Sequence, residues 1–405
     1  MLKSTWRRSA VALAIILLAS SAATLSAGPA IAASVAPVAA PGLSAAASSA
    51  VSMQQGSVQL ELPRPTGPYA VGVGTLHLTD WDRTDPWVPS AGPRQLSVSM
   101  FYPARHDTGE PAPYMTLGEA QGFVATRIPP GTGVQPQDVM AIKTYAYTDA
   151  KAASGKFPLV VLSPGFENPR ATLTSLATDL ASHGYVVALV GHTYEDSGET
   201  LADGSTPGCT LCAGGAPDTL PDSRAKDVSF VLDRLTGHHP AWRLAHLIDR
   251  DRIGMAGHSA GGESALTAMA EDQRILAGVN MDGQFDPPVP ADKLQGRAFL
   301  LLGKQSDHSA GGGETSWGKT WARWDGYKPW LAVAGASHAS FTDVPILGAE
   351  IGLPVPPGMT TSPARGAQLT REYVGAFFDQ TLKGIHQPLL DGPSSANPEV
   401  LFQHP

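Results

Sequence analysis

Short apolar runs, rich in valine, leucine and isoleucine, alternate along this chain with stretches that have the composition of helices. The apolar runs lie at residues 96–102, 159–163, 185–190, 252–256, 277–281, 299–303 and 330–334. The helix-like stretches lie at residues 171–182, 223–235, 260–270, 316–325 and 369–382. Strands that are apolar throughout are buried on both faces, which is typical of parallel sheets covered by helices. The alternation therefore predicts an α/β fold with a mostly parallel sheet and helices on both faces.

The composition is that of a globular chain with an acidic balance. Of the 405 residues, 42% are hydrophobic and 16% are charged, and the formal net charge is −8. An acidic chain without a cluster of lysine and arginine lacks the basic face that binds phosphate backbones, so no nucleic-acid partner is expected. No internal repeat or linker interrupts residues 57–405. We therefore predict a single domain there, with long excursions at 103–157, 191–222 and 343–368.

The first 32 residues have the order of a secretory signal peptide. Lys3, Arg7 and Arg8 precede an apolar run at residues 10–19, and small residues with cleavable endings follow. The apolar run is shorter than the ~20 residues of a membrane span, so residues 1–32 are predicted to be removed on export, leaving no stable membrane anchor. Residues 33–56 are rich in alanine, serine and proline and carry no charge, which predicts a flexible segment. We expect the mature protein to be secreted.

The sequence Gly-His-Ser-Ala-Gly at residues 257–261 stands between a predicted strand and a predicted helix. A serine on such a sharp turn needs glycine two residues before and after it, because side chains there would collide with the strand and the helix. The turn exposes the hydroxyl, and the helix N-terminus stabilises negative charge that develops beside it. The motif predicts Ser259 as the nucleophile of an acyl-transfer reaction.

A second loop, with the sequence Leu-Ser-Pro-Gly-Phe at residues 162–166, ends an earlier predicted strand. In acyl-transfer enzymes with a serine on a strand–turn–helix element, one oxyanion donor follows the nucleophile and the other comes from an earlier loop of this kind. The backbone N–H groups of Ala260 and Phe166 are therefore the predicted oxyanion donors.

The general base is expected to be a histidine downstream of the serine. His308, His338 and His386 meet this condition. His338 follows a predicted strand, at the edge where catalytic groups of open α/β sheets gather, and it is the predicted base. His308 lies in a loop rich in serine and glycine, and His386 follows the last predicted helix.

Two aspartates qualify as the acid that orients this histidine. Asp282 ends the first predicted strand after the nucleophile, and Asp307 follows the next predicted strand. Both lie at carboxyl ends of strands, so their spacing leaves both open.

Several segments, in a specific order, resemble the secreted platelet-activating factor acetylhydrolases of the isoform II type and their bacterial relatives. They are residues 67–72, 78–80, 85–87, 101–104, 224–228, 230–235, 281–283 and 341–343, with the serine turn and His338. The resemblance implies an α/β-hydrolase fold and ester hydrolysis without a metal or cofactor. It also implies a Ser/Asp/His triad whose acid lies on the strand after the nucleophile, which favours Asp282. The implied substrates are short-chain or lipid-like esters.

Residues 163–166, 181–184 and 335–338 also resemble cutinase-like polyester hydrolases. That family places the acid one strand later, which would favour Asp307, and it implies a polyester as the alternative substrate. Because the segments before residue 105 resemble the acetylhydrolases alone, Asp282 is preferred. A further alternative is a non-catalytic binding protein of the same fold. Such proteins usually lose the serine or the histidine, whereas this chain retains both.

The two cysteines, Cys209 and Cys212, lie in a loop rich in glycine and proline. In an exported chain they are predicted to form a short disulfide. A zinc site would need four ligands, and the sequence offers no others nearby, so no metal site is predicted.

Two further clusters have less specific patterns. The first is acidic and consists of Glu195, Asp196, Glu199 and Asp203. These carboxylates could hold Ca²⁺, but we interpret them as part of a solvated loop. The second is aromatic and consists of Trp317, Trp321 and Trp324, whose helical spacing indicates packing in the core.

Overall fold

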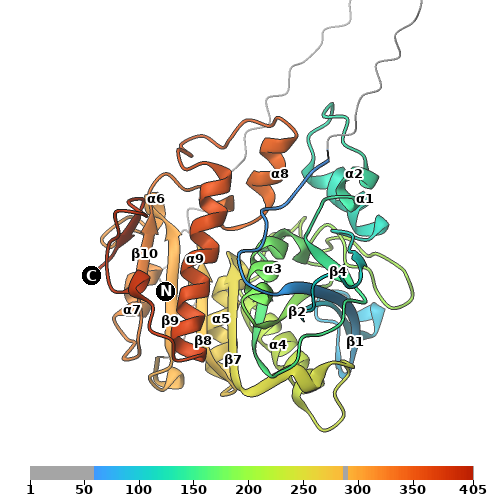
Figure 1. Cartoon of the computed structure of the whole chain (residues 1–405), viewed down its shortest axis with the longest axis horizontal. Helices are drawn as coiled ribbons and strands as arrows, with labels where there is room; N and C mark the ends of the chain where they lie inside the picture. Colours follow the sequence, from blue (N-terminus) through green and yellow to red (C-terminus); the bar gives the residue numbers. More distant parts are fainter. Residues whose placement is uncertain (1–58, 286–290, 405) are drawn as a thin grey trace, which may run out of the picture. The chain divides into compact units, whose positions relative to one another are not determined.

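One mixed β-sheet carries the fold of the residues described by the structure, a computed structural model, which are 59–285 and 291–404. In this part of the chain eleven strands follow the order β11-β10-β9-β8-β7-β5-β6-β2-β1-β4-β3 (Figure 1). They are β1 (Ala70–Thr84), β2 (Pro93–Ala104), β3 (Glu110–Pro111), β4 (Ala146–Thr148), β5 (Phe157–Ser163), β6 (Val186–His192), β7 (Ile248–His258), β8 (Ile275–Met281), β9 (Ala298–Lys304), β10 (Trp330–Val333) and β11 (Val400–Phe402). The predicted signal peptide and the flexible segment after it lie outside the described residues.

The central part of the sheet is parallel. Strands β6, β5, β7, β8, β9 and β10 each run parallel to the next. On one side β2 and β1 continue the sheet as a long antiparallel hairpin, and on the other side β11 pairs antiparallel with β10. All seven apolar runs of the sequence fall in strands, namely β2 and the six parallel ones. The prediction of a mostly parallel sheet is confirmed.

Nine α-helices lie in the described residues (Figure 1). They are α1 (Leu117–Arg127), α2 (Pro136–Met140), α3 (Thr174–Ser182), α4 (Leu220–Thr236), α5 (Ala260–Glu271), α6 (Gln305–His308), α7 (Ser316–Trp321), α8 (Val344–Glu350) and α9 (Pro363–Leu382). The five predicted helices correspond to α3, α4, α5, α7 and α9, although α7 ends four residues earlier than predicted. Helices α1, α2 and α8 lie in the excursions that the sequence left unassigned.

The two faces of the parallel strands pack against different helices. Leu159 and Val161 of β5 lie in an apolar cluster with α4 and α5. Val160 and Leu162 of the same strand lie in a second cluster with α3 and α9. Successive side chains of a strand point to opposite faces, so a strand between two apolar layers is apolar at every position. The carboxyl ends of these strands, which carry the predicted site residues, are thereby held on a rigid base.

The C-terminal segment covers one edge of this sheet. Strand β11 pairs with β10, and the Gln403 N–H donates to the Trp330 carbonyl at 2.8 Å. Arg365 of α9 binds the carboxylate of Glu399 at 3.0 Å, directly before the strand. The last described residues are therefore part of the fold.

Candidate active site

Ser259 lies on a sharp turn between β7 and α5. Its backbone has φ 54° and ψ −123°, which places a residue with a side chain in the costly positive-φ region. A Cβ on Gly257 would lie 2.1 Å from the Gly261 carbonyl carbon, and a Cβ on Gly261 would lie 2.0 Å from the Ser163 oxygen. Both glycines are therefore required for the chain to make this turn.

A carboxylate and an imidazole meet at the same edge of the sheet. Nδ1 of His338 lies 2.6 Å from Oδ2 of Asp282. Asp282 follows β8 directly and is buried, and its Oδ1 accepts the Lys304 N–H at 2.6 Å. His338 begins the short 3₁₀ helix His338–Phe341 after β10, and its side chain is 50% exposed. A buried acid thus orients a histidine that solvent can reach.

Contacts of the serine turn tie it to both members of this pair. The Ser259 N–H donates to the Met281 carbonyl at 2.8 Å, one residue before Asp282. On the other side, His258 Nε2–H donates to the His338 carbonyl at 2.8 Å, and the two imidazole rings lie 4.6 Å apart. The structure therefore brings together Ser259, Asp282 and His338, which lie after three different strands, β7, β8 and β10.

His258 is a neutral histidine within this arrangement. Burial, together with the charge of His338 beside it, lowers the pKa of His258 to about 3. Its single proton is assigned to Nε2, because this nitrogen donates to the His338 carbonyl. Nδ1 is buried against Gly165, where a Cβ would lie 2.9 Å away. His258 therefore fixes the backbone of the His338 loop and leaves room only for glycine at position 165.

The loop at residues 163–166 lies next to the serine. A Cβ on Gly165 would lie 3.3 Å from Cβ of Ser259. The Asn168 N–H donates to the Gly165 carbonyl at 3.1 Å, whereas no acceptor for the Phe166 N–H is found among the described residues. Ala260 is the first residue of α5, where backbone N–H groups have no acceptor within the helix. Two backbone donors are thus available beside Ser259.

The alternative acid lies apart from the histidine. Asp307, in α6, is partly exposed, and its Oδ2 lies 2.8 Å from Nζ of Lys304. Within the described ranges it forms no hydrogen bond or ion pair with His338. His386, one of the three candidate bases, is exposed and lies 3.2 Å from Asp391.

His308 contacts the same acid from the other side. It is buried, its Nε2 lies 3.4 Å from Oδ1 of Asp282, and its ring stacks on Trp317 with centroids 3.9 Å apart. Trp317 and Trp324 are buried, as predicted, and Trp321 is partly buried against the same core. The sequence offered no signal for the approach of His308 to Asp282.

The acidic stretch after β6 differs from its prediction. Among its four members Glu195, Asp196 and Glu199 are buried, and Asp203 is exposed. Glu195 pairs with Arg94 and Arg224, and Glu199 pairs with Arg170. The interpretation as a solvated loop is therefore wrong for three of these residues, because arginines from distant segments neutralise two of them inside the protein. In the loop that follows, Cys209 and Cys212 are joined by a disulfide.

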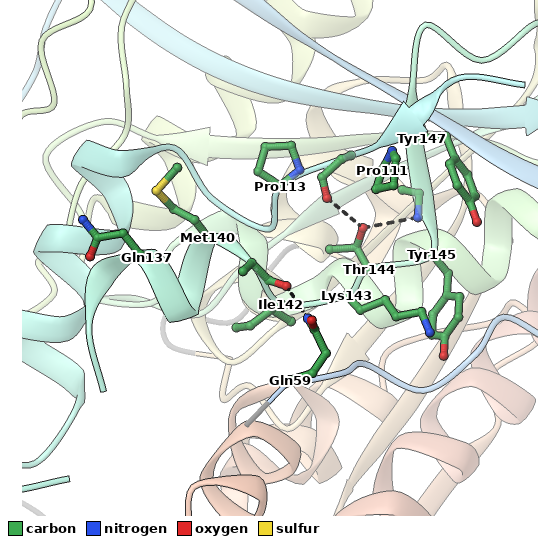
Figure 2. Close-up of a pocket in the computed structure, with 13 residues that line it drawn as sticks. Gln59, Pro111, Pro113, Gln137, Met140, Ile142, Lys143, Thr144, Tyr145 and Tyr147 are labelled. Atoms are coloured by element: carbon green, nitrogen blue, oxygen red, sulfur yellow. Dashed lines mark hydrogen bonds between the residues drawn. The ribbon is translucent and has the colours of Figure 1, made fainter. Parts of the chain in front are cut away.

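Two pockets among the described residues lie away from the serine. One of about 690 Å³ is lined by α2 and the segment before β4, including Met140, Lys143 and Tyr145 (Figure 2). Another of about 610 Å³ lies between α3 and α9 and includes Asp179 and Arg371. Ser259 lines neither of them, so neither accounts for the arrangement around the serine.

Comparisons with known proteins identify relatives of this chain. The sequence profile of the platelet-activating factor acetylhydrolases, isoform II, matches residues 54–202 and 228–387. The chain belongs to this family. A probable 1-alkyl-2-acetylglycerophosphocholine esterase of Arthroderma benhamiae is 29% identical over 84% of this chain and 93% of its own. The resemblance found in the sequence is thus confirmed.

The names of two further relatives indicate other ester substrates. A solved ferulic acid esterase from Streptomyces cinnamoneus is 42% identical, with a TM-score of 0.75, over 85% of this chain and all of that chain. A bis(hydroxyethyl) terephthalate hydrolase of Streptomyces coelicolor is 29% identical over 33% of this chain and 35% of its own, in keeping with the weaker cutinase-like resemblance. The fold is that of the α/β-hydrolases, and the protein is a carboxylic ester hydrolase. None of its described helices has both the length and the hydropathy needed to cross a membrane.

Proposed function

We propose that this hydrolase is an exported serine esterase in which Ser259 attacks the ester carbonyl, His338 is the base and Asp282 orients the histidine. The observation that carries the proposal is the 2.6 Å contact between His338 Nδ1 and Asp282 Oδ2 beside the positive-φ serine turn. A carboxylate on Nδ1 keeps the proton there, so Nε2 is left to act as the base.

The reaction then has two halves. Nε2 of His338 takes the hydroxyl proton as the oxygen of Ser259 bonds to the carbonyl carbon, and the N–H groups of Phe166 and Ala260 stabilise the oxyanion. The protonated histidine gives its proton to the departing alcohol, and the acyl group remains on the serine. Water, deprotonated by the same nitrogen, then releases the carboxylic acid and restores the serine hydroxyl.

The substrates that we propose are esters of ferulic acid or similar hydroxycinnamic acids. The ferulic acid esterase supports this choice, because its 42% identity extends over its whole chain. The half-exposed imidazole of His338 also supports it, since an ester on a bulky alcohol can reach an open site. The second candidate is the acetyl ester of an alkyl glycerophosphocholine, which the family match and the Arthroderma relative favour.

A fluorophosphonate probe followed by a substrate panel tests the proposal. We expect the probe to label wild-type protein at Ser259 and to leave Ser259→Ala unlabelled and without esterase activity. The panel contains methyl ferulate, 4-nitrophenyl acetate, an oxidised short-chain phospholipid and a polyester film. A higher kcat/KM for methyl ferulate than for the phospholipid supports the first substrate class, and the reverse order supports the second. Activity of Ser259→Ala within tenfold of wild type would contradict the assignment of the nucleophile.

Export is proposed from residues 1–32, whose charged, apolar and small segments follow the order of a signal peptide. Expression of the full chain in a bacterial host, with N-terminal sequencing of the protein in the medium, tests it. We expect the mature chain to begin near residue 33, and an intact Met1 in the exported protein would contradict the cleavage.

A further inference from the structure

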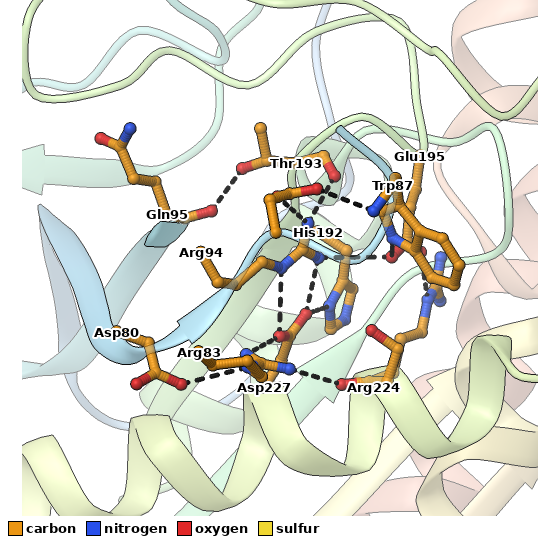
Figure 3. A network of polar contacts seen from close by, with 12 residues as sticks. Asp80, Arg83, Trp87, Arg94, Gln95, His192, Thr193, Glu195, Arg224 and Asp227 are labelled. Atoms are coloured by element: carbon orange, nitrogen blue, oxygen red, sulfur yellow. Dashed lines mark hydrogen bonds and ion pairs between the residues drawn. The ribbon is translucent and has the colours of Figure 1, made fainter. Parts of the chain in front are cut away.

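A chain of hydrogen bonds from a serine through a histidine to an aspartate begins in the predicted oxyanion loop; its histidine and aspartate, His192 and Asp227, are drawn in Figure 3. Ser163, the last residue of β5, has its Oγ 2.9 Å from Nε2 of His192. Nδ1 of His192, at the end of β6, lies 2.8 Å from Oδ2 of Asp227 on α4. All three side chains are buried, so a substrate cannot reach them. This chain of hydrogen bonds therefore acts as a support.

Arg224 connects the support to the backbone of the loop. Its Nη1 donates to the Pro164 carbonyl at 2.5 Å and lies 3.3 Å from the Ser163 Oγ. Its Nε donates to the Glu195 carboxylate at 2.7 Å (Figure 3). One guanidinium therefore holds both a side chain and a carbonyl group just before Phe166.

Arg224 belongs to a cluster of ion pairs. The arginines of the cluster are Arg83, Arg94 and Arg224, and its acids are Asp80, Asp85, Glu195 and Asp227. Burial and the charge of Arg224 lower the pKa of His192, so the histidine adds no charge. His192, Glu195 and Asp227 have the spacing of metal ligands, but each of them already binds other side chains of the protein. The cluster is complete with its own side chains.

A neutral His192 gives the hydrogen bonds one consistent direction. Its Nδ1–H donates to Asp227, so its Nε2 accepts the Ser163 hydroxyl, whose oxygen in turn accepts Arg224 Nη1–H. A buried group that lost its partner here could not replace it with water. Ser163 and Arg224 are therefore held in one arrangement.

We infer that Arg224 is a positioning residue that holds the Ser163–Pro164 backbone so that the Phe166 N–H meets the oxyanion. The inference rests on the proposed function, in which Phe166 is an oxyanion donor. Such a donor stabilises the transition state more than the bound ester, so its displacement lowers kcat and changes KM little. A purely structural arginine would instead lower the fraction of folded protein and leave the turnover of each folded molecule unchanged.

Arg224→Met in the full chain tests the inference, with active sites counted by fluorophosphonate labelling of Ser259. We expect kcat per labelled site on 4-nitrophenyl acetate to fall about 10²-fold, the size of a lost oxyanion donor, with KM within about threefold. Arg224→Lys should recover part of this loss, because an ammonium reaches one acceptor but lacks the planar fork.

Arg83→Met is the matched control. Arg83 binds Asp227 in the same cluster, and its contacts with Asp80 and with the Ser223 carbonyl lie outside the loop. We expect its kcat per labelled site to stay within about threefold of wild type. If Arg224→Met does not fold, Ser163→Ala tests the inference in its place. This variant retains Arg224 and removes one of the two contacts between the arginine and the loop. That variant should lose about tenfold in kcat.

Two results would overturn the inference. One is a kcat per labelled site equal to that of wild type in two single variants, Ser163→Ala and one of the two Arg224 variants. The other is an equal loss in Arg83→Met and Arg224→Met, because the effect would then belong to the whole charge cluster. Failure of the proposed function differs from both, since wild-type protein would then show no labelling at Ser259.

Discussion

The molecule contains two Ser–His–Asp arrays that share the same contact between histidine and acid and differ in their surroundings. The outer array consists of Ser259, His338 and Asp282, and the inner array consists of Ser163, His192 and Asp227. The distance from Nδ1 to the carboxylate is 2.6 Å in the outer array and 2.8 Å in the inner one. The histidine side chain is 50% exposed in the outer array and 1% exposed in the inner one. Similar hydrogen bonds between histidine and acid therefore occur in the proposed active site, which solvent can reach, and in the closed interior of the protein.

The arrays also differ in what else binds the acid and the serine. The inner acid, Asp227, is bound by Arg83 and Arg94, so its charge is already neutralised by permanent cations. The outer acid, Asp282, accepts a backbone N–H from Lys304 and lies against His338, so its charge remains available to an imidazolium. An acid of this second kind stabilises a histidine that gains and loses a proton.

Amidation of the acid should have different effects in the two arrays, and the largest effect on activity is expected in the outer one. Asp282→Asn removes the charge that orients and stabilises His338. We expect kcat to fall about 10⁴-fold, or ~5.5 kcal/mol, as for the acid of a serine protease triad. The measurement is steady-state hydrolysis of 4-nitrophenyl acetate, with circular dichroism to check the fold. A loss of less than tenfold would show that a residue other than Asp282 is the acid that orients His338.

Asp227→Asn should act on stability. It leaves Arg83 and Arg94 with an amide in place of a carboxylate in a buried site. We expect the free energy of unfolding to fall by about 3–5 kcal/mol, the cost of breaking a buried ion pair. Urea unfolding of Asp227→Asn and Asp282→Asn measures the free energy of unfolding of each variant, and we expect the lower value for Asp227→Asn. If the outer variant were the less stable of the two, the inner array would not be the support that we describe.

Asp343 is a third buried acid, and unlike Asp227 it forms no ion pair with an arginine or lysine in the described part of the chain. It accepts the Ser175 hydroxyl and the Ser175 N–H, and burial raises its pKa to about 7. Between about pH 4 and pH 7 the native chain then binds a proton that the unfolded chain has lost, so stability falls as the pH rises.

Asp343→Asn should remove this fall, which is of the order of a few kcal/mol. Urea unfolding of wild type and variant at pH 5 and pH 8 measures it as a gain in the relative stability of the variant at the higher pH. A relative stability that does not change between the two pH values would show that Asp343 is ionised throughout.

Asp307→Asn should have the smallest effect. Asp307 is partly exposed and binds Lys304 rather than His338. We expect kcat within about tenfold of wild type, as for a surface substitution away from the site. A loss near that of Asp282→Asn would favour the arrangement of the cutinase-like enzymes.

The parts of the molecule with a local signal could be predicted from the sequence. Each strand of the parallel block contains a run of mostly apolar residues because both of its faces are buried there, and such runs can be recognised in the sequence. The turn at Ser259 has its glycines two residues on either side. Strand β1 was missed because it belongs to an antiparallel hairpin in which many side chains are exposed, and its sequence mixes threonine, histidine and aspartate with apolar residues.

The inner array has no such local signal. Ser163, His192 and Asp227 come from three separate elements, and their contacts depend on how β5, β6 and α4 pack. Glu195 was assigned to a solvated loop because its partner Arg94 lies 101 positions away in the sequence. The spacing of Arg224 and Asp227, three residues apart on one helix face, was the one local hint that both enter the same cluster.

Strand β11 has a consequence for how copies of this protein behave in solution. Without it, the backbone N–H and C=O groups along the outer side of β10 would be open to any other extended chain. A protein shortened to residue 397 is expected to form oligomers by pairing of these open strands, which size-exclusion chromatography would detect as early elution. We therefore expect β11, which forms the edge of the sheet with only three residues, to limit pairing between the sheets of separate molecules.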